Sequence, residues 1–178
     1  MILYNFFKNK KVLVTGHTGF KGSWLVAWLN ILGCEVMGIS LNPVKGDNHF
    51  KILKKNLDII DKRGDIRNEK YLKKLVKKFK PDIVFHLAAQ AIVSTSYSHP
   101  KLTFETNVLG TLNLLNALAE LKNKCIGIFV TSDKCYKNIE VTRGYTETDE
   151  LGGDDFYSSS KASAELAIHS FYKSFIKD

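Results

Sequence analysis

A glycine-rich turn between an apolar run and an amphipathic segment limits most strongly what this chain can fold into. Residues 11–15 read Lys-Val-Leu-Val-Thr, and Gly16, Gly19 and Gly22 follow at the spacing G-x-x-G-x-x-G. Glycines there permit a sharp turn, a close approach of the backbone to a pyrophosphate and tight packing of a helix on a strand. The N–H groups and the dipole of a helix that begins there favour an anion. The pattern predicts a dinucleotide site at the edge of a parallel sheet; a turn that binds nothing is the alternative.

The segment after the turn has the period of a helix. Leu25, Trp28, Leu29 and Leu32 recur at positions i, i+3, i+4 and i+7, which predicts that these four side chains form one apolar face. Gly33 stands where the C-terminus of a helix favours glycine.

Further apolar runs alternate with helical segments along the chain. We expect strands at 35–39, 59–63, 82–87 and 125–130, helices at 70–80, at about 104–118 and from Tyr157 onward, and loops at 43–56 and 94–100. Strands that alternate with helices form a parallel sheet with right-handed crossovers. The predicted fold is therefore α/β, a single domain over residues 1–178 with a doubly wound parallel sheet of the Rossmann type.

One of the predicted helices carries an amide on its apolar side. Phe104, Val108, Leu112, Leu115 and Leu118 are expected on its inner face, and Asn107 falls close to that face. A buried amide needs hydrogen-bond partners, so Asn107 is a candidate site residue.

Composition narrows the range of partners. The net charge is +8, and much of the excess comes from one lysine-rich run over 70–80, which we interpret as the solvated face of a helix. A nucleic-acid patch is disfavoured, because the run lacks interleaved aromatic residues. A positive field attracts an anionic small molecule such as a sugar nucleotide.

Several kinds of protein are excluded on composition. No apolar run reaches the length of about 18 residues that a membrane span needs, and the apolar N-terminus is too short for a signal peptide. The 3 cysteines have no metal-like spacing and fit a reducing compartment. We therefore expect a cytoplasmic protein without a metal site and without a membrane or nucleic-acid partner.

The residues expected near an adenosine leave the choice of dinucleotide open. The second strand ends in Ser40-Leu41-Asn42-Pro43, with neither the acid that holds ribose hydroxyls nor an arginine for a 2′-phosphate. Asp65, beside Ile66, could accept from an adenine amino group. Equally, Asp65 or Asn68 could cap the lysine-rich helix.

Small residues follow the fourth strand. Leu87, Ala88, Ala89 and Gln90 would let a flat cofactor lie against the backbone. The alternative is a tight strand end without a ligand.

A tyrosine and a lysine open the last helix. Tyr157 and Lys161 are one helical turn apart and project from the same face. A nearby ammonium favours the phenolate, so Tyr157 is a candidate base for an alcohol that loses hydride.

Four motifs in this order resemble the extended short-chain dehydrogenases/reductases that act on nucleotide sugars. They are residues 15–22 (TGHTGFKG), 86–90 (HLAAQ), 104–111 (FETNVLGT) and 157–161 (YSSSK). Residues 17–25, 40–43 and 132–136 resemble the CDP-glucose 4,6-dehydratases more than the dTDP-glucose or GDP-mannose dehydratases.

The resemblance implies an internal redox cycle on a nucleotide-sugar substrate with NAD as cofactor. Tyr157 would take the proton of the 4-hydroxyl, Ser132 would hydrogen-bond the 4-oxygen, Asp133 would be the acid and Lys134 the base. Lys134 must be neutral to act so, which a desolvated site beside Lys161 favours. The implied cofactor-binding residues are Gly16, Thr18, Gly19, Phe20, Gly22, Asp65, Ile66, Leu87, Ala88, Ala89, Gln90, Asn107, Tyr157 and Lys161.

The resemblance covers nearly all of this chain but only about the first half of the usual length of the family. A second hypothesis is therefore a cofactor-binding fragment that is inactive or depends on a separate chain carrying the other half, and a third is a nucleotide-sugar epimerase or reductase. The full-length family implies a homo-oligomer.

Overall fold

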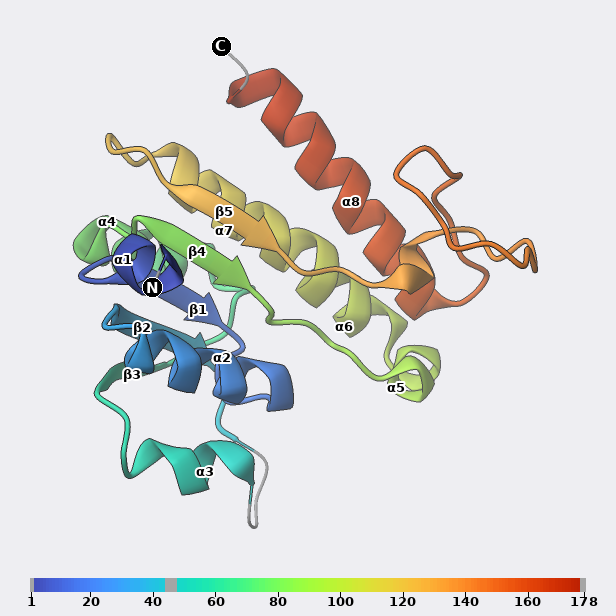
Figure 1. Cartoon of the computed structure of the whole chain (residues 1–178). Coiled ribbons are helices and arrows are strands. Elements are labelled where there is room, and N and C mark those ends of the chain that lie inside the picture. Colours follow the sequence, from blue (N-terminus) through green and yellow to red (C-terminus); the bar gives the residue numbers. More distant parts are fainter. Residues whose placement is uncertain (1, 44–47, 177–178) are drawn as a thin grey trace.

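A parallel sheet of five strands runs through the middle of the molecule (Figure 1). The computed structural model describes residues 2–43 and 48–176. The strands are β1 (Lys11–Thr15), β2 (Glu35–Ser40), β3 (Ile59–Arg63), β4 (Ile83–His86) and β5 (Ile126–Phe129). Their order across the sheet is β3-β2-β1-β4-β5, and every neighbouring pair is parallel. The predicted parallel sheet and all five predicted strands are confirmed.

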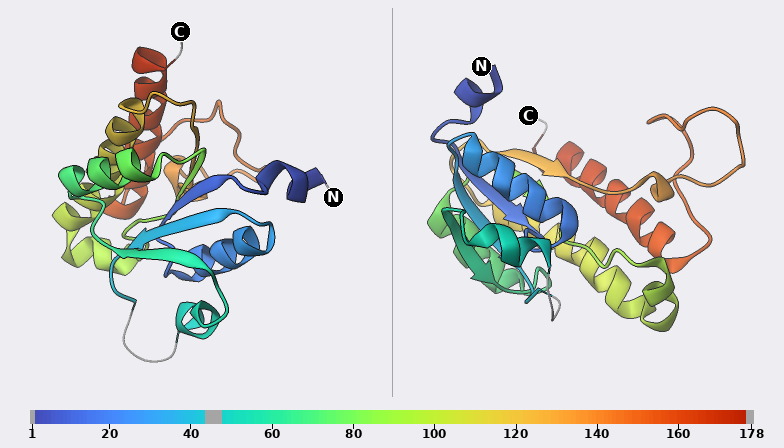
Figure 2. Two further views of the ribbon diagram at one scale, coloured as in Figure 1. Left: turned by 90° about the vertical axis from the view of Figure 1, so that its left-hand side faces the viewer. Right: turned by 60° about the horizontal axis from the view of Figure 1, so that its bottom comes forward.

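Helices cover both faces of this sheet. The helices of the described residues are α1 (Ile2–Phe7), α2 (Phe20–Ile31), α3 (His49–Lys54), α4 (Glu69–Phe79), α5 (Val93–Ser98), α6 (Pro100–Phe104), α7 (Gly110–Ala119) and α8 (Phe156–Phe175), with a π-helical turn η1 (Glu105–Leu109) and a 3₁₀ turn η2 (Asp133–Cys135). Figures 1 and 2 show α2 on one face, with α3 beyond it, and α4 and α7 on the other. The long helix α8 packs against α7 and α6. Among the described residues, none of these helices is both long and apolar enough to cross a bilayer.

The central strand β1 supplies a core to both faces. Val12 and Val14 pack in one apolar cluster with Val26 of α2, whereas Leu13 belongs to a second cluster with Val76 of α4. Successive side chains of a strand point to opposite faces, and a strand covered on both sides is apolar throughout. This is why the run over 11–15 does not alternate with polar residues.

The turn after β1 requires glycine at two positions. Gly16 has a φ of 75°, in the left-handed region, and a Cβ on it would lie 2.7 Å from the backbone nitrogen of Ala88. A Cβ on Gly22 would lie 2.2 Å from the carbonyl oxygen of Gly16. The predicted close approach of α2 to the turn is confirmed.

The buried face of α2 differs from the predicted one. Val26 and Leu29 are fully buried, but Leu25 is only half-buried and Trp28 is 54% exposed. The helix is anchored on the sheet through Gly22, so its buried face follows Gly22, Val26 and Leu29 at spacings of four and three. Trp28 therefore points to solvent.

Both predicted loops contain a short helix. In 43–56, Asn48 caps α3 by accepting a hydrogen bond from the backbone N–H of Lys51, and Phe50 packs edge-on against the His17 ring at 5.0 Å. In 94–100, the buried Ser96 closes the first turn of α5 by donating to the carbonyl of Val93. Helices of one or two turns show too little periodicity to be predicted. Gly46 and Asp47, which suggested a loop, lie outside the described residues.

The predicted helix over 104–118 is interrupted by the π-helical turn η1. A π-helical turn shifts the side chains that follow relative to a regular helix. The face turned inward carries Asn107 and Thr111 as well as Leu114 and Leu115, while Phe104, Val108, Leu112 and Leu118 are only half-buried. The inner face is thus more polar than the spacing predicted.

The lysine-rich helix α4 is as predicted. Leu72, Val76 and Phe79 are buried, and the lysines point outward, apart from the half-buried Lys73, which pairs with acids. Asn68, not Asp65, caps the helix by accepting from the backbone N–H of Tyr71.

The fit of His17 beneath β2 gives a stability prediction. The ring of His17 is fully buried, and a Cβ on Gly38 would lie 2.3 Å from its Cγ. Gly38→Ala should therefore lower the free energy of unfolding by about 1–3 kcal/mol, the usual cost of overpacking. Urea unfolding followed by circular dichroism measures this difference.

Gly144→Ala is the matched control, because a Cβ there would meet nothing within 4 Å. It should change the free energy of unfolding by less than about 0.5 kcal/mol. Equal stabilities of the two variants would contradict the predicted clash.

Candidate functional site

A cleft with a volume of about 680 Å³ opens at the carboxyl ends of the central strands. We call it the strand-end cleft. One wall is the glycine-rich turn with the start of α2, and all five residues predicted there line it: Gly16, Thr18, Gly19, Phe20 and Gly22. No side chain caps the N-terminal end of α2 at Gly19. The N–H groups of its first turn are therefore available to an anion in the cleft.

The far end of the cleft is formed where β2 and β3 end. Asp65 and Ile66 line it, as predicted. Arg67 donates to both carboxylate oxygens of Asp65, from Nε to Oδ1 at 3.1 Å and from Nη2 to Oδ2 at 2.6 Å. These hydrogen bonds lower the pKa of Asp65 against the opposing effect of burial. Asp65 is thus an ionised acceptor whose charge Arg67 already balances.

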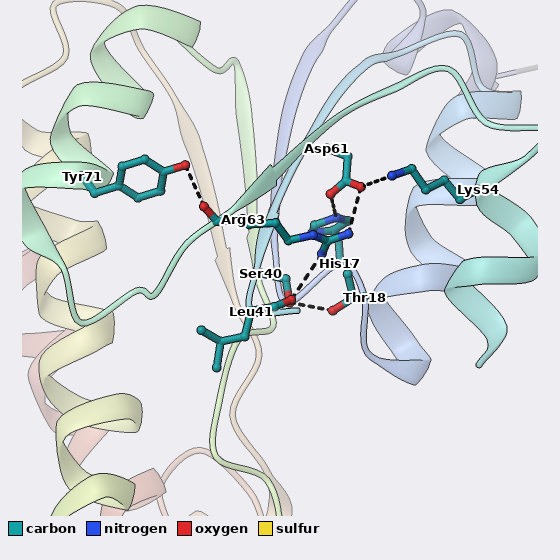
Figure 3. Close-up of polar contacts among 8 residues, drawn as sticks. All are labelled: His17, Thr18, Ser40, Leu41, Lys54, Asp61, Arg63 and Tyr71. Carbon is teal, nitrogen blue, oxygen red and sulfur yellow. Dashed lines mark hydrogen bonds and ion pairs between the residues drawn. The ribbon is translucent and has the colours of Figure 1, made fainter. Parts of the chain in front are cut away.

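An arginine that the sequence did not reveal stands beside the end of β2. The register pairs Ser40 with Arg63 of β3, and Nη1 of Arg63 donates to the carbonyl oxygen of Leu41 at 3.2 Å (Figure 3). Arg63 itself does not line the cleft, and it reaches the end of β2 only because β3 pairs in parallel with that strand. The end of the neighbouring strand, read in parallel register, was the available signal.

The floor of the cleft is the backbone that leaves β4. Leu87, Ala88, Ala89 and Gln90 all line it. The backbone N–H of Ala88 donates to Oγ1 of Thr15 at 3.2 Å. The floor is therefore tied to the end of β1, as well as being in contact with Gly16.

Asn107 supports the floor from below and does not line the cleft. Its Oδ1 accepts from the backbone N–H of Gln90 at 2.8 Å, and its Nδ2 donates to the carbonyl of Gln90 and to Oγ of Ser160. Ser160 donates in turn to the carbonyl oxygen of Tyr157 at 2.7 Å. Asn107 thus joins the floor to the start of α8, and the prediction of a direct cofactor contact finds no support in the cleft lining.

Tyr157 and Lys161 face the glycine turn across the cleft. Both line it, and they are only 8% and 6% exposed. Asp155 caps α8 by accepting from the backbone N–H of Ser158 at 3.0 Å, which fixes where the helix begins. Burial lowers the pKa of Lys161. The cleft therefore brings together a phenol, a desolvated amine and an anion-binding helix start.

The other three predicted catalytic residues lie outside the cleft lining. Ser132 is half-buried, and Asp133 and Lys134 are exposed on η2. Oγ of Ser132 donates to Oδ1 of Asp133 at 3.0 Å and accepts from the backbone N–H of Lys134 at 3.2 Å. η2 packs against α8, but the roles of these three residues stay predictions.

No metal centre is found among residues 2–43 and 48–176. No three side chains of His, Cys, Asp or Glu gather there in a way that could hold a metal ion. Cys34, Cys125 and Cys135 are free thiols.

A buried hydrogen-bond relay runs beneath the floor through His86. Thr111 donates its hydroxyl proton to the carbonyl of Asn107 at 2.7 Å, so its oxygen accepts from Nε2–H of His86 at 3.0 Å. A neutral imidazole then has a bare Nδ1, which accepts from the hydroxyl of Thr15 at 2.7 Å. Burial, and secondarily the charge of Lys161, lowers the pKa of His86 to about 3. The relay links Ala88, through His86, to Asn107.

The chain is similar to a set of nucleotide-sugar enzymes. The sequence model of the GDP-mannose 4,6 dehydratase family matches residues 13–176. A CDP-glucose 4,6-dehydratase of Salmonella typhimurium is 46% identical over 176 residues, which cover 98% of this chain and 49% of that protein.

Two solved structures share the fold and carry NAD. A dTDP-glucose 4,6-dehydratase of Bacillus anthracis in complex with NAD superimposes with a TM-score of 0.77 at 26% identity, over 93% of this chain and 51% of that chain. A UDP-glucose 4-epimerase of Thermus thermophilus in complex with NAD gives a TM-score of 0.77 at 31% identity, with the same coverage. The chain spans about half the length of the relatives it matches.

The relay predicts how stability depends on pH. Between about pH 6.5 and pH 3 the unfolded chain binds a proton at His86 that the folded chain does not, so stability falls as the pH falls through this window. His86→Gln removes this contribution. From about pH 7 to pH 5 the native chain should lose about 2 kcal/mol more unfolding free energy than the variant.

Urea unfolding at the two pH values measures the difference. His99→Gln, at an exposed histidine, is the control and should keep the pH dependence of the native chain. A His86→Gln variant with the native pH dependence would contradict a buried neutral imidazole.

Proposed function

The chain belongs to the GDP-mannose 4,6 dehydratase family, and from this membership we propose that it forms the coenzyme-binding part of a nucleotide-sugar 4,6-dehydratase. The proposed coenzyme is NAD and the proposed substrate is CDP-glucose, which becomes a 4-keto-6-deoxy sugar nucleotide. The observation that carries the proposal is the meeting of Tyr157 and Lys161 with the glycine-rich turn in one cleft. The likeness to the Salmonella enzyme supports the choice of CDP-glucose.

The residues of the cleft fit a dinucleotide. The turn at Gly16 and Gly22 has no room for a Cβ, so the backbone alone forms this wall and a pyrophosphate can approach it closely. The uncapped start of α2 supplies N–H donors. Asp65 and Ile66 would contact the adenine, and the floor from Leu87 to Gln90 would lie along the nicotinamide half.

NAD, when bound, accepts hydride from the sugar and returns it within one turnover. Tyr157 takes the proton of the 4-hydroxyl as the hydride leaves C4, and the cation at Lys161 stabilises the phenolate. Because burial lowers the pKa of Lys161, its proton is held less firmly than that of an exposed lysine. The pair is therefore suited to passing a proton rather than only to fixing a charge.

The turn η2 carries the elimination step in this proposal. Ser132 hydrogen-bonds the 4-oxygen, Lys134 as the neutral amine removes the proton at C5, and Asp133 as the carboxylic acid protonates the leaving 6-hydroxyl, so that water departs and hydride returns to C6. Because Asp133 and Lys134 are exposed, this step requires η2 to be covered when the sugar is bound. The hydrogen bond from Ser132 to Asp133 holds the two side chains together beside the start of α8. Because Tyr157 lines the cleft and the residues of η2 do not, the sugar has to extend from the Tyr157 end of the cleft to η2.

A second candidate is a coenzyme-binding part that turns over no sugar by itself. Ile126 and Ile128 of β5 are 53% and 38% exposed, and an apolar strand of this kind is suited to be covered by further protein. That covering would be another segment of the whole enzyme or a separate chain. We also propose that the whole enzyme self-associates and that it is located in the cytoplasm.

Tyr157→Phe tests the proposed chemistry. With NAD and CDP-glucose supplied, the native chain should form a 4-keto sugar, detected by its absorbance after alkali. The variant should lose at least about 100-fold in rate, because it lacks the group that takes the 4-hydroxyl proton.

Tyr172→Phe, at a half-exposed position of the same helix, is the control and should keep the native rate. Equal rates for the two variants would contradict the role of Tyr157. If no product forms but NAD raises the melting temperature, the second candidate is favoured. The absence of both signals would contradict both candidates.

A further inference from the structure

A carboxylate that the proposed chemistry leaves unused lies close to the Tyr157–Lys161 pair. Glu165 is one helical turn after Lys161 on α8, and residues four apart share a face of a helix. Its Oε1 accepts a hydrogen bond from Oγ1 of Thr131, in the segment that leaves β5. Thr131 lines the strand-end cleft and precedes Ser132, whereas Glu165 is half-buried and does not line the cleft. Glu165 therefore contacts the cleft through Thr131 and not directly.

Lys161 is a buried cation, and the groups around it act on its charge in opposite directions. Burial lowers the pKa of Lys161, and the positive charge of Lys21 on α2 lowers it further, whereas the negative charge of Glu165 raises it. Two further titratable groups nearby supply no charge near neutral pH. Burial raises the pKa of the Cys135 thiol on η2 and lowers the pKa of the His86 imidazole to about 3. Among the described residues, Glu165 is thus the carboxylate that stabilises the Lys161 cation.

The same carboxylate fixes the segment that leads from β5 into η2. The hydroxyl of Thr131 is held by Glu165, and the next residue, Ser132, caps η2. A hydrogen bond to an ionised acceptor is stronger than one between neutral groups. Since η2 packs against α8, Glu165 joins the turn that carries the proposed elimination to the helix that carries Tyr157 and Lys161.

We propose that Glu165 is a positioning residue for both halves of the reaction. Its charge keeps Lys161 in the cationic form that stabilises the Tyr157 phenolate. Its hydrogen bond to Thr131 holds η2 beside the same pair. The inference rests on the proposed function, because it takes Tyr157 and Lys161 as the pair that removes the 4-hydroxyl proton. It adds a residue outside the cleft and assigns each role to a different property of one carboxylate.

Titration of Lys161 tests the first role without any turnover. In a chain labelled with ¹³C at the ε-carbon of lysine, the NMR signal of Lys161 is identified by its loss in Lys161→Arg. Glu165→Gln keeps an acceptor for Thr131 but removes the charge, so the ionisation constant of Lys161 should rise by at least about threefold. Glu147→Gln is the matched control: it removes the same charge from an exposed loop and should change this constant by less than about twofold.

Thr131→Val tests the second role, because it removes the hydroxyl while the charge of Glu165 stays. The ionisation constant of Lys161 should then change by less than about twofold. The backbone N–H of Cys135 donates to the carbonyl oxygen of Ser132 at 3.0 Å in η2, and its hydrogen exchange should become at least about threefold faster. Glu165→Gln should keep this exchange closer to the native rate, because its amide oxygen still accepts. Thermal melting reports whether each variant folds.

A pH profile of turnover is the third readout. With NAD and CDP-glucose supplied, Glu165→Gln should move the alkaline fall of the rate to lower pH, because the Lys161 cation is lost earlier. A role of Glu165 in the fold alone would lower the rate equally at every pH.

The outcomes separate this inference from the proposed function. An unchanged ionisation constant of Lys161 in Glu165→Gln, or an equal change in Glu147→Gln, would overturn the inference. Native hydrogen exchange of η2 in Thr131→Val would overturn it as well. Turnover by Glu165→Gln with the native pH profile would contradict the inference and leave the proposed function standing. If the native chain neither binds NAD nor forms a 4-keto sugar, the proposed function fails on that measurement alone, whatever the variants show.

Discussion

The backbone of the glycine turn lies in direct contact with the backbone that leaves β4, and this contact sets the position of the site. No side chain fits between Gly16 and Ala88, so the end of β1 and the floor of the cleft are fixed relative to each other. Thr15 adds hydrogen bonds to the backbone of Ala88 and to His86. Through the relay and Asn107, the same contact reaches the start of α8. The two halves of the cleft are therefore held by one continuous set of buried, satisfied polar groups.

The inner strands β2, β1 and β4 were predictable because they are buried in a parallel sheet and are largely apolar. The edge strands β3 and β5 are more exposed, and β3 ends in three charged residues. The short helices were not predictable. α3 depends on one cap at Asn48 and one buried ring at Phe50, and neither produces a periodic signal. The predicted buried face of α2 was wrong at Trp28. Tryptophan is an apolar residue, but the close packing of Gly22 against the turn determines which face of the helix is buried. Tertiary contact overrode the local pattern in each case.

The parts of the candidate site that consist of neighbouring residues in the sequence were predictable. Contacts between side chains of different helices and strands were less so. The glycine turn, the small residues after β4 and the Tyr157–Lys161 pair all line one cleft. Asn107 instead acts beneath the floor, since the π-helical turn directs its amide to Gln90. The hydrogen bond from Arg63 to the carbonyl oxygen of Leu41 was not predictable, because it comes from the pairing of β2 with β3, which no spacing within one strand encodes. The sequence alone also does not place η2 relative to the cleft.

The π-helical turn η1 has a consequence for how this part of the chain can vary in length. It lies between α6 and α7, and it accommodates one residue more than a regular helix would. Deletion of the extra residue would let α6 and α7 continue as one regular α-helix with their mutual rotation little changed, so that only the side chains within the turn would be redirected. Asn107 lies in the turn, and its hydrogen bonds to the backbone of Gln90 depend on this geometry. In evolution, the length of the turn should therefore be kept as long as the amide of Asn107 supports the floor of the cleft, even where individual side chains are free to change.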